Sequence, residues 1–124
     1  MHTKNPHDRA RELHDLITDE RKKRHTTTAV GNTMEDIFIV GTNEEYLRLE
    51  VRKALFEDEI IARSRAGNHA EENVMDEAEA RNLTLSAIGA SRPICLDCEE
   101  KIKTMGIDTE TEFSGKISRN RRIL

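Results

Sequence analysis

Aromatic side chains are scarce in this chain of 124 residues: they make up 3% of it, and tryptophan is absent. Proteins that bind single-stranded nucleic acid without sequence preference usually stack bases on several aromatic rings, so a binding surface built mainly of such rings is excluded. We expect Phe38 and Phe56 in the core, which leaves Tyr46 and Phe113 as candidate stacking residues.

Long apolar runs are also missing. No run approaches the roughly 18 residues that a membrane-spanning helix requires, so the sequence predicts no membrane association. The first residues, MHTKNPHDRARELHDLI, contain no apolar segment, and we therefore expect no signal peptide. Because repeats, low-complexity tracts and Pro/Gly-rich linkers are absent too, we interpret residues 1–124 as one domain with a modest core.

Cysteine occurs only twice, at Cys95 and Cys98. A disulfide-based fold uses more cysteines, so that class is excluded. The C-x-x-C spacing favours either a metal site or a redox pair.

The charge is unevenly distributed. The net charge of −4 argues against binding nucleic acid through bulk electrostatics. Residues 1–25 nevertheless carry a net charge of +2, whereas residues 35–80 carry −8. The last nine residues are basic through Lys116, Arg119, Arg121 and Arg122, and this tip either meets phosphates or is a solvated tail. We interpret His2, His7, His14 and His25 as surface residues.

In the first half of the chain, hydrophobic periodicity predicts two helices and a hairpin. The helices cover residues 7–23 and about 43–57, and Thr42 with Glu45 forms a capping box for the second. The strands, 26–30 and 37–40, are joined through GNTMED, with Gly31 and Asn32 as the turn residues.

In the second half, the pattern predicts a helix over 68–81, a strand over 83–89 and a helix that starts near Cys95 and ends at Gly106. A further strand is expected after Ile107. The order α-ββ-α-α-β-α-β indicates an α/β fold of the α+β sandwich type, with a mixed sheet of four to five strands covered by helices. We divide it into an N-terminal helical segment (1–25), a core (26–107) and a C-terminal strand with the basic tip (108–124).

One short stretch, GNHAEENVM at residues 67–75, allows two interpretations. In the first, Asn68 and Glu71 form a capping box at the start of a helix. In the second, His69 and Glu71 belong to a metal site.

The two cysteines favour the metal site. Cys95 follows His69 by 26 residues, and a helix, a strand and a loop lie between them. A right-handed crossover of this length places two helix N-termini side by side at one sheet edge, so that His69, Cys95 and Cys98 converge. Three N/S ligands leave one tetrahedral position open, which is the catalytic arrangement for one zinc ion. Glu71 then lies beside the open position as a general acid/base.

The motif H-x-E followed by P-x-C-x-x-C (Pro93 to Cys98) resembles the signature of the zinc-dependent cytidine deaminase-like superfamily. The resemblance covers residues 26–107, and Ile94 is inserted before the first cysteine. The run SRPICLDCEEKIKTMGI is similar to the deaminase domains at the C-termini of bacterial polymorphic toxins.

This resemblance implies hydrolytic removal of the exocyclic amine of cytosine, or less often of adenine, with His69, Cys95 and Cys98 as ligands and Glu71 as the catalytic residue. It also implies a sugar contact by Asn43, for which a role beside the Thr42 cap is the alternative. We further expect the Ala70 backbone, Ser91 and Arg92 to lie near the substrate.

Four functions follow as hypotheses. The first is a cytosine deaminase acting on nucleic acid, with DNA favoured over RNA and single strands over duplexes. It implies secretion as part of a larger toxin, action in the cytoplasm of a target cell and an immunity protein in the producing cell. The others are a free cytidine or nucleoside deaminase, a non-catalytic zinc-stabilised binding module and a redox C-x-x-C protein, in which His69 and Glu71 have no role.

Overall fold

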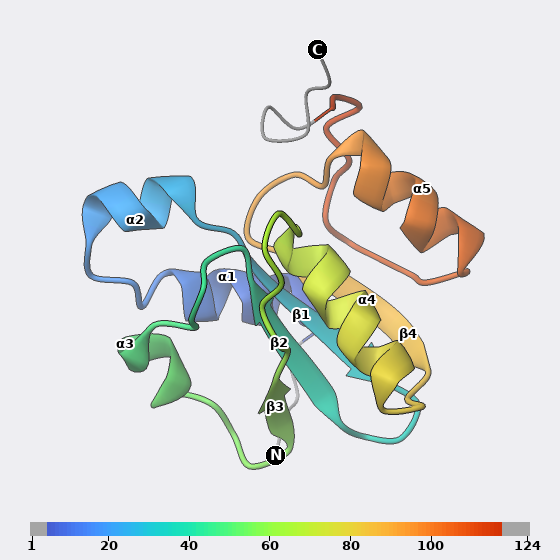
Figure 1. The fold of residues 1–124 in the computed structure, drawn as a ribbon, viewed down its shortest axis with the longest axis horizontal. Helices are drawn as coiled ribbons and strands as arrows, with labels where there is room; N and C mark the ends of the chain where they lie inside the picture. The colour runs from blue at the N-terminus through green and yellow to red at the C-terminus, as the bar shows by residue number, and fades with distance from the viewer. Residues whose placement is uncertain (1–4, 118–124) are drawn as a thin grey trace.

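The computed structural model describes residues 5–117, and its centre is a four-stranded mixed sheet (Figure 1). The strands are β1 (Thr28–Thr33), β2 (Phe38–Thr42), β3 (Glu59–Ile61) and β4 (Leu85–Ala90). Their order across the sheet is β3-β2-β1-β4; β1 is antiparallel to both neighbours, and β3 is parallel to β2. This arrangement confirms the predicted α+β sandwich with a mixed sheet.

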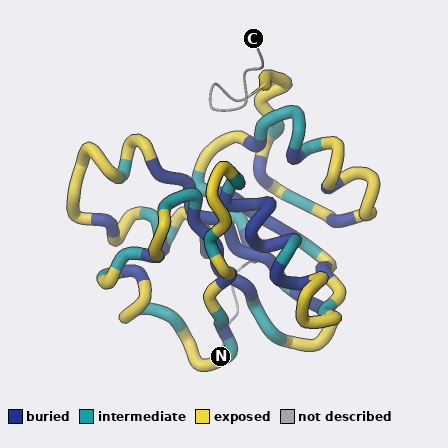
Figure 2. Tube along the Cα trace, in the orientation of Figure 1, coloured by how far each residue is buried: buried dark blue, intermediate teal, exposed yellow. Residues whose placement is uncertain are grey.

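Helices cover both faces of the sheet. Adjacent residues of a strand point to opposite faces: Ala29 and Ile39 pack in the cluster under α4 (Ala70–Ala80) and α5 (Leu96–Thr104). Val30 and Val40, the next residues, pack in a second cluster with α1 (Pro6–His14) and α3 (Leu49–Arg52). The centre of the molecule is therefore buried on both sides of the sheet (Figure 2).

The expected turn residues Gly31 and Asn32 lie instead within β1, where they pair with Ile39 and Phe38. The turn of the hairpin follows Thr33, and Asp36 supplies its positive φ of 62°. The prediction of the hairpin is confirmed, but that of its turn is wrong. Gly31 is required for another reason, since a Cβ there would lie 2.5 Å from Cγ1 of Val74 in α4.

Gly41 allows an equally close approach between β2 and the first turn of α4. A Cβ at this position would lie 2.9 Å from both the Ala70 carbonyl oxygen and Cγ2 of Val74. The Ala70 carbonyl belongs to the helix backbone and cannot rotate away. The start of α4 therefore rests directly on the sheet.

The helix predicted over residues 7–23 is two helices, α1 and α2 (Glu20–His25). Asp19 caps the second by accepting a hydrogen bond from the Lys22 backbone N–H (3.1 Å), and Thr18 donates its N–H to Glu50 Oε2 (3.1 Å). These two bonds fix a non-helical link between α1 and α2 that the apolar periodicity does not indicate.

The helix predicted over 43–57 is also wrong for most of its length, because only α3 is helical there and β3 follows it. Thr42 Oγ1 accepts from the Glu44 N–H (3.2 Å) and not from the N–H of Glu45. Glu59 starts β3, and its buried carboxylate forms an ion pair with Arg9 of α1 (2.7 Å). This long-range pair holds the segment as an edge strand.

The second half of the chain follows the prediction more closely. The strand at β4 and the two helices α4 and α5 are confirmed, and Gly106 ends α5 with a φ of 69°. The strand expected after Ile107 is wrong for residues up to 117, which form only isolated bridges, Ala87 with Asp108 and Ile94 with Phe113. Lys116 is exposed, whereas Arg119, Arg121 and Arg122 lie outside the described residues.

Within residues 5–117, no helix is both long enough and apolar enough to cross a membrane.

Of the histidines interpreted as surface residues, His25 is exposed, whereas His7 and His14 are half-buried and His2 lies outside the described part of the chain. His14 Nδ1 lies 3.0 Å from Thr28 Oγ1, and its Nε2 lies 2.8 Å from the Lys23 carbonyl oxygen. Burial lowers the pKa of His14; its hydrogen bond to Lys23 opposes the shift, and the charge of Arg92 adds to it. The neutral imidazole is thus the form that the fold favours.

We predict that Gly41→Ala lowers the free energy of unfolding by about 2 kcal/mol, because the added methyl group meets the backbone of α4. Urea unfolding followed by circular dichroism measures the change. Ser86→Ala, at an exposed position of β4, is the control and should change stability by less than about 0.5 kcal/mol. A Gly41→Ala protein as stable as the wild type would contradict the close packing of α4 on β2.

A second prediction concerns pH. Because the folded pKa of His14 lies below its ordinary value, the unfolded chain binds the proton more readily, and stability is lost as the pH falls below about 6.5. Between about pH 7.5 and 5.5, the free energy of unfolding should therefore fall more in the wild type than in His14→Gln. Urea titrations at both pH values test this, and an equal fall in the two proteins would refute it.

Candidate metal centre

The candidate site forms where α4 and α5 begin, at the same end of the molecule (Figure 1). His69 and Cys95 are the residues immediately before the two helices and adopt extended backbone conformations. Because α4 packs across β1, β2 and β4 and α5 follows β4, the sheet brings both helix starts together. The expected convergence of the two motifs is confirmed.

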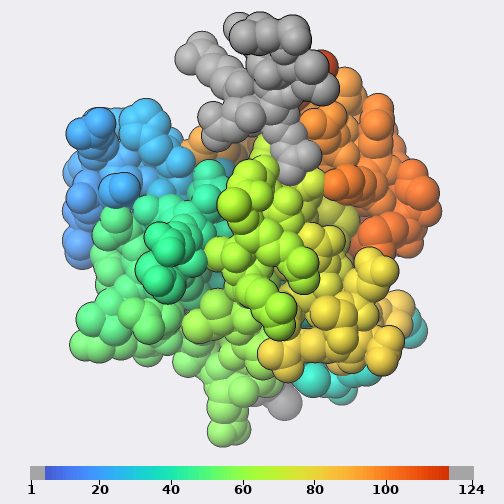
Figure 3. Space-filling view, viewed as in Figure 1, coloured from blue at the N-terminus to red at the C-terminus, as the bar shows by residue number. Residues whose placement is uncertain are grey.

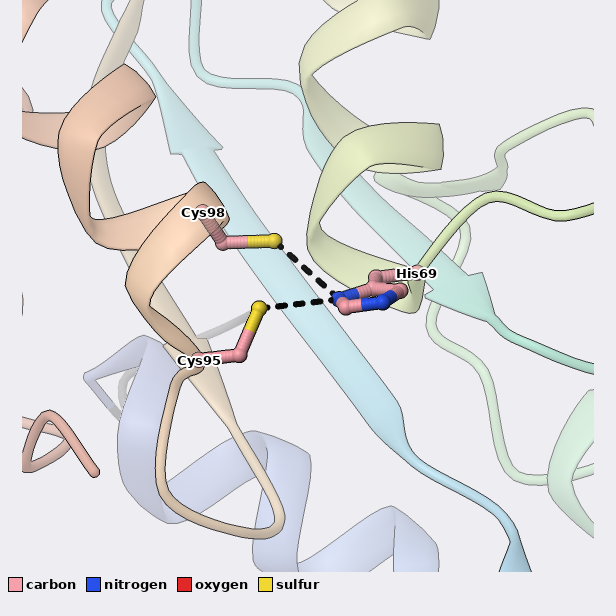
Figure 4. A group of neighbouring side chains, drawn as sticks. All are labelled: His69, Cys95 and Cys98. Carbon is pink, nitrogen blue, oxygen red and sulfur yellow. Dashed lines mark hydrogen bonds between the residues drawn. The ribbon is translucent and has the colours of Figure 1, made fainter. Parts of the chain in front are cut away.

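His69 directs its ring toward both cysteines (Figure 4). Its Nδ1 lies 3.1 Å from Cys95 Sγ and 3.4 Å from Cys98 Sγ, and all three candidate ligand atoms lie within 4.8 Å of one another. Cys95 and Cys98 are both free thiols. This group could hold one metal ion.

The spacing fits the ion that the sequence motif implies. Tetrahedral zinc with bonds of about 2.3 Å to sulfur and about 2.0 Å to nitrogen separates an S and an N ligand by about 3.5 Å. The two sulfur-to-nitrogen distances in the cluster lie close to this value. Three protein ligands leave one coordination position for another molecule.

The cap of α4 differs from the prediction. The His69 backbone N–H donates to Glu72 Oε1 (2.9 Å), so the reciprocal carboxylate is Glu72 and not Glu71. Asn68 instead donates its side-chain amide to Asn73 Oδ1 (3.1 Å) and to Asp76 Oδ2 (3.0 Å). The capping box expected from Asn68 and Glu71 is therefore wrong.

Glu72 connects the two helices of the site, a role that sequence reasoning missed. Its second carboxylate oxygen pairs with Lys101 of α5, while the first holds the His69 backbone. The two positions are 29 residues apart, and their pairing depends on how α4 and α5 pack. Glu72 and Lys101 fix the helix starts relative to each other.

Glu71 is buried, with only 3% of its surface exposed, in the first turn of α4. Burial raises the pKa of its carboxyl group, and the positive charge of Arg92 partly opposes the shift. A buried carboxyl group beside a candidate metal site is suited to accept and release protons.

Cys98 is completely buried, and burial raises the pKa of its thiol; the negative charge of Glu71 adds to the shift. Without a cation, the fold therefore favours the protonated thiol. A metal ion binds the thiolate, so binding at this group releases protons.

A cavity of about 450 Å³ adjoins the cluster, within the size range of small-molecule sites. His69, Cys95 and Glu71 line it, and so do three of the four residues expected near the substrate, Asn43, Ala70 and Arg92. The remaining lining residues are His25, Thr27, Pro93, Ser114, Lys116 and Ile117. Of these, His25 and Lys116 are basic groups at the cavity that the motifs do not indicate.

Three of the expected substrate residues also hold the backbone around the cavity. Asn43 Oδ1 accepts from the Thr27 N–H (2.9 Å), and Ser91 Oγ accepts from the Thr28 N–H (3.0 Å). Ser91 lines a smaller neighbouring cavity of about 260 Å³ and not the larger one. Arg92 donates to two backbone carbonyls of the N-terminal segment. Each of these bonds joins segments that are distant in the sequence.

Comparisons of the chain with protein-family models, curated proteins and solved structures find no match.

We predict that the chain binds one zinc ion and that Cys95→Ala weakens this binding at least about 100-fold, because one of three ligands is lost. Titration against a chromophoric chelator measures both the stoichiometry and the affinity. His25→Gln is the matched control, since His25 lines the same cavity but lies outside the cluster. Equal zinc affinities for Cys95→Ala and the wild type would exclude the site.

Proposed function

We propose that the chain is a zinc-dependent hydrolytic deaminase that converts cytosine in nucleic acid, single-stranded DNA in particular, to uracil. One observation carries the proposal: two members of the His-Cys-Cys cluster, His69 and Cys95, line the same cavity as the buried Glu71. A site that only stabilises the fold has no need of a buried acid beside an open coordination position.

Zinc is the metal that suits the donor set of one imidazole and two thiolates. Zinc bound there would act as a Lewis acid that lowers the pKa of a coordinated water and so supplies a nucleophile near neutral pH.

The proton transfers of the reaction fall to Glu71. Water adds to C4 of cytosine, and the Glu71 carboxylate accepts one of its protons and delivers it to ring N3. The carboxylate then moves the second proton of the water to the exocyclic amine, which leaves as ammonia, and uracil remains. The burial of Glu71 keeps these protons from exchanging with bulk solvent.

Other residues of the cavity position the base. The Ala70 backbone lies between His69 and Glu71 in the sequence and lines the cavity in which the base would bind. Asn43, held by its bond to Thr27, offers its amide N–H group to a sugar or a base edge. The cavity thus brings hydrogen-bonding groups and the proton-transfer group together.

Basic side chains favour nucleic acid over a free nucleoside as the substrate. His25, Arg92 and Lys116 line the cavity of a chain whose net charge is −4. A nucleoside carries no phosphate and would make no use of them. The motif resemblance extends the proposal to a toxin domain that is carried by a larger secreted protein and neutralised in the producing cell by an immunity protein.

We predict that Glu71→Gln lowers the rate of uracil formation in single-stranded DNA at least about 100-fold and leaves bound zinc unchanged, because the amide cannot transfer protons. Uracil is detected by glycosylase cleavage of a labelled oligonucleotide, and zinc by mass spectrometry. Glu79→Gln, at an exposed position of the same helix, is the control and should retain the wild-type rate.

Two outcomes would contradict the proposal. If the Glu71→Gln variant formed uracil at the wild-type rate, Glu71 would not be the proton-transfer residue. Zinc-loaded wild-type protein that deaminates neither single-stranded DNA nor RNA would refute the nucleic-acid substrate, and turnover of free cytidine would then identify the alternative.

A further inference from the structure

The helix α2 is unusual because none of its residues is buried. It forms an exposed lobe at the edge of the molecule (Figures 2 and 3). Short helices in proteins are normally stabilised by packing an apolar face, which α2 does not have. Its sequence, ERKKRH, contains four basic residues and a histidine. Packing against the hydrophobic core therefore does not explain why α2 is helical.

Polar bonds at its C-terminal end hold α2 in place. Arg92 Nη2 donates to the carbonyl oxygens of Arg24 (2.7 Å) and Thr26 (2.8 Å). His14 Nε2 forms a hydrogen bond with the Lys23 carbonyl oxygen (2.8 Å). Arg92 belongs to the loop that leads into α5, so the end of α2 is fixed to the segment that carries the metal ligands.

Helical spacing orients the basic side chains of α2. Arg21, Arg24 and His25 are related by i, i+3 and i, i+4 steps and share one face of the helix. His25 on this face lines the cavity of the metal centre. We call these three residues the α2 stripe; its C-terminal member, His25, is the one that reaches the cavity.

The other two basic residues of α2 point elsewhere. Lys22 lies 3.9 Å from a carboxylate oxygen of Glu44, and Lys23 lies 3.9 Å from one of Asp15. The carboxylates of both partners lower the net positive charge on those sides of the helix. The α2 stripe is thus the side of the helix that is suited to an anionic ligand.

The cavity rim next to the α2 stripe is also positively charged. Arg92 and Lys116 line the cavity together with His25, whereas residues 35–80 of the chain carry a net charge of −8. The phosphate backbone of a nucleic acid that approaches this protein is attracted to the α2 stripe and to the cavity rim. It is repelled by the acidic residues between 35 and 80.

We propose that the α2 stripe binds consecutive phosphates of a single nucleic-acid strand and leads the strand to the cavity. This inference rests on the proposed function and specifies how its substrate is bound. Arg92 acts as a positioning residue, because it fixes the end of α2 beside the cavity. Since aromatic residues make up only 3% of the chain, phosphate contacts supply most of the affinity, which therefore depends strongly on salt.

The test compares two double variants of equal charge. Arg21→Gln/Arg24→Gln removes two charges from the stripe, and Arg52→Gln/Lys53→Gln removes two exposed charges at the end of α3. Zinc-loaded proteins are titrated into a fluorescein-labelled mixed-sequence single-stranded DNA, and the dissociation constant is measured by anisotropy at several salt concentrations. A parallel titration uses vesicles of phosphatidylserine and phosphatidylcholine.

For the stripe variant, we expect the dissociation constant to rise about tenfold and the slope of log K against log salt to fall by about 1.4, or about 0.7 per lost phosphate contact. The α3 variant should lose much less affinity and keep its slope. Equal losses in the two variants would overturn the proposal, as would a stripe variant that loses vesicle binding but keeps its affinity for DNA.

The binding assay requires no turnover, so it separates this inference from the deaminase proposal. DNA binding that depends on the stripe, in a protein that forms no uracil, would support the surface and contradict the enzyme. A wild-type protein that deaminates free cytidine and binds no oligonucleotide would contradict the surface and retain the enzyme.

Discussion

The close approach of α4 to the sheet is the constraint on which the site depends. A Cβ at Gly31 would lie 2.5 Å from Val74, and one at Gly41 would lie 2.9 Å from the backbone of Ala70. Because glycine has only a hydrogen atom in place of a side chain, the first turn of α4 can rest directly on β2. The positions of His69 and Glu71 are therefore set by the sheet and not by a loop.

The second half of the site is held by bonds that cross the sequence. Ile94, fully buried before α5, accepts a hydrogen bond from the Ser114 N–H (2.8 Å) and donates its own N–H to the Glu112 carbonyl (2.9 Å). Glu72 and Lys101 join α4 to α5. Contacts between protein groups from distant parts of the sequence thus hold both helix starts in place.

The features that the sequence predicted correctly depend on local signals, such as the glycine stop at Gly106, the two helix starts and the spacing of the ligand motifs. Two of the features that it mispredicted depend on distant partners. The pairing of Arg9 with Glu59 holds β3 where a helix was expected, and Gly31 lies under Val74 and not in a turn. No local pattern indicates such contacts, and the position of His25 at the cavity was missed for the same reason.

X-ray absorption spectroscopy at the zinc edge of the zinc-loaded protein tests the metal centre most directly. We predict two sulfur ligands at about 2.3 Å and lighter ligands at about 2.0 Å, one of them the imidazole of His69. Zinc without sulfur ligands would show that the ion binds elsewhere, and zinc with four sulfur ligands, which requires cysteines from two chains, would show a closed site shared between two copies. Either result would contradict a catalytic metal centre at the start of α4 and α5.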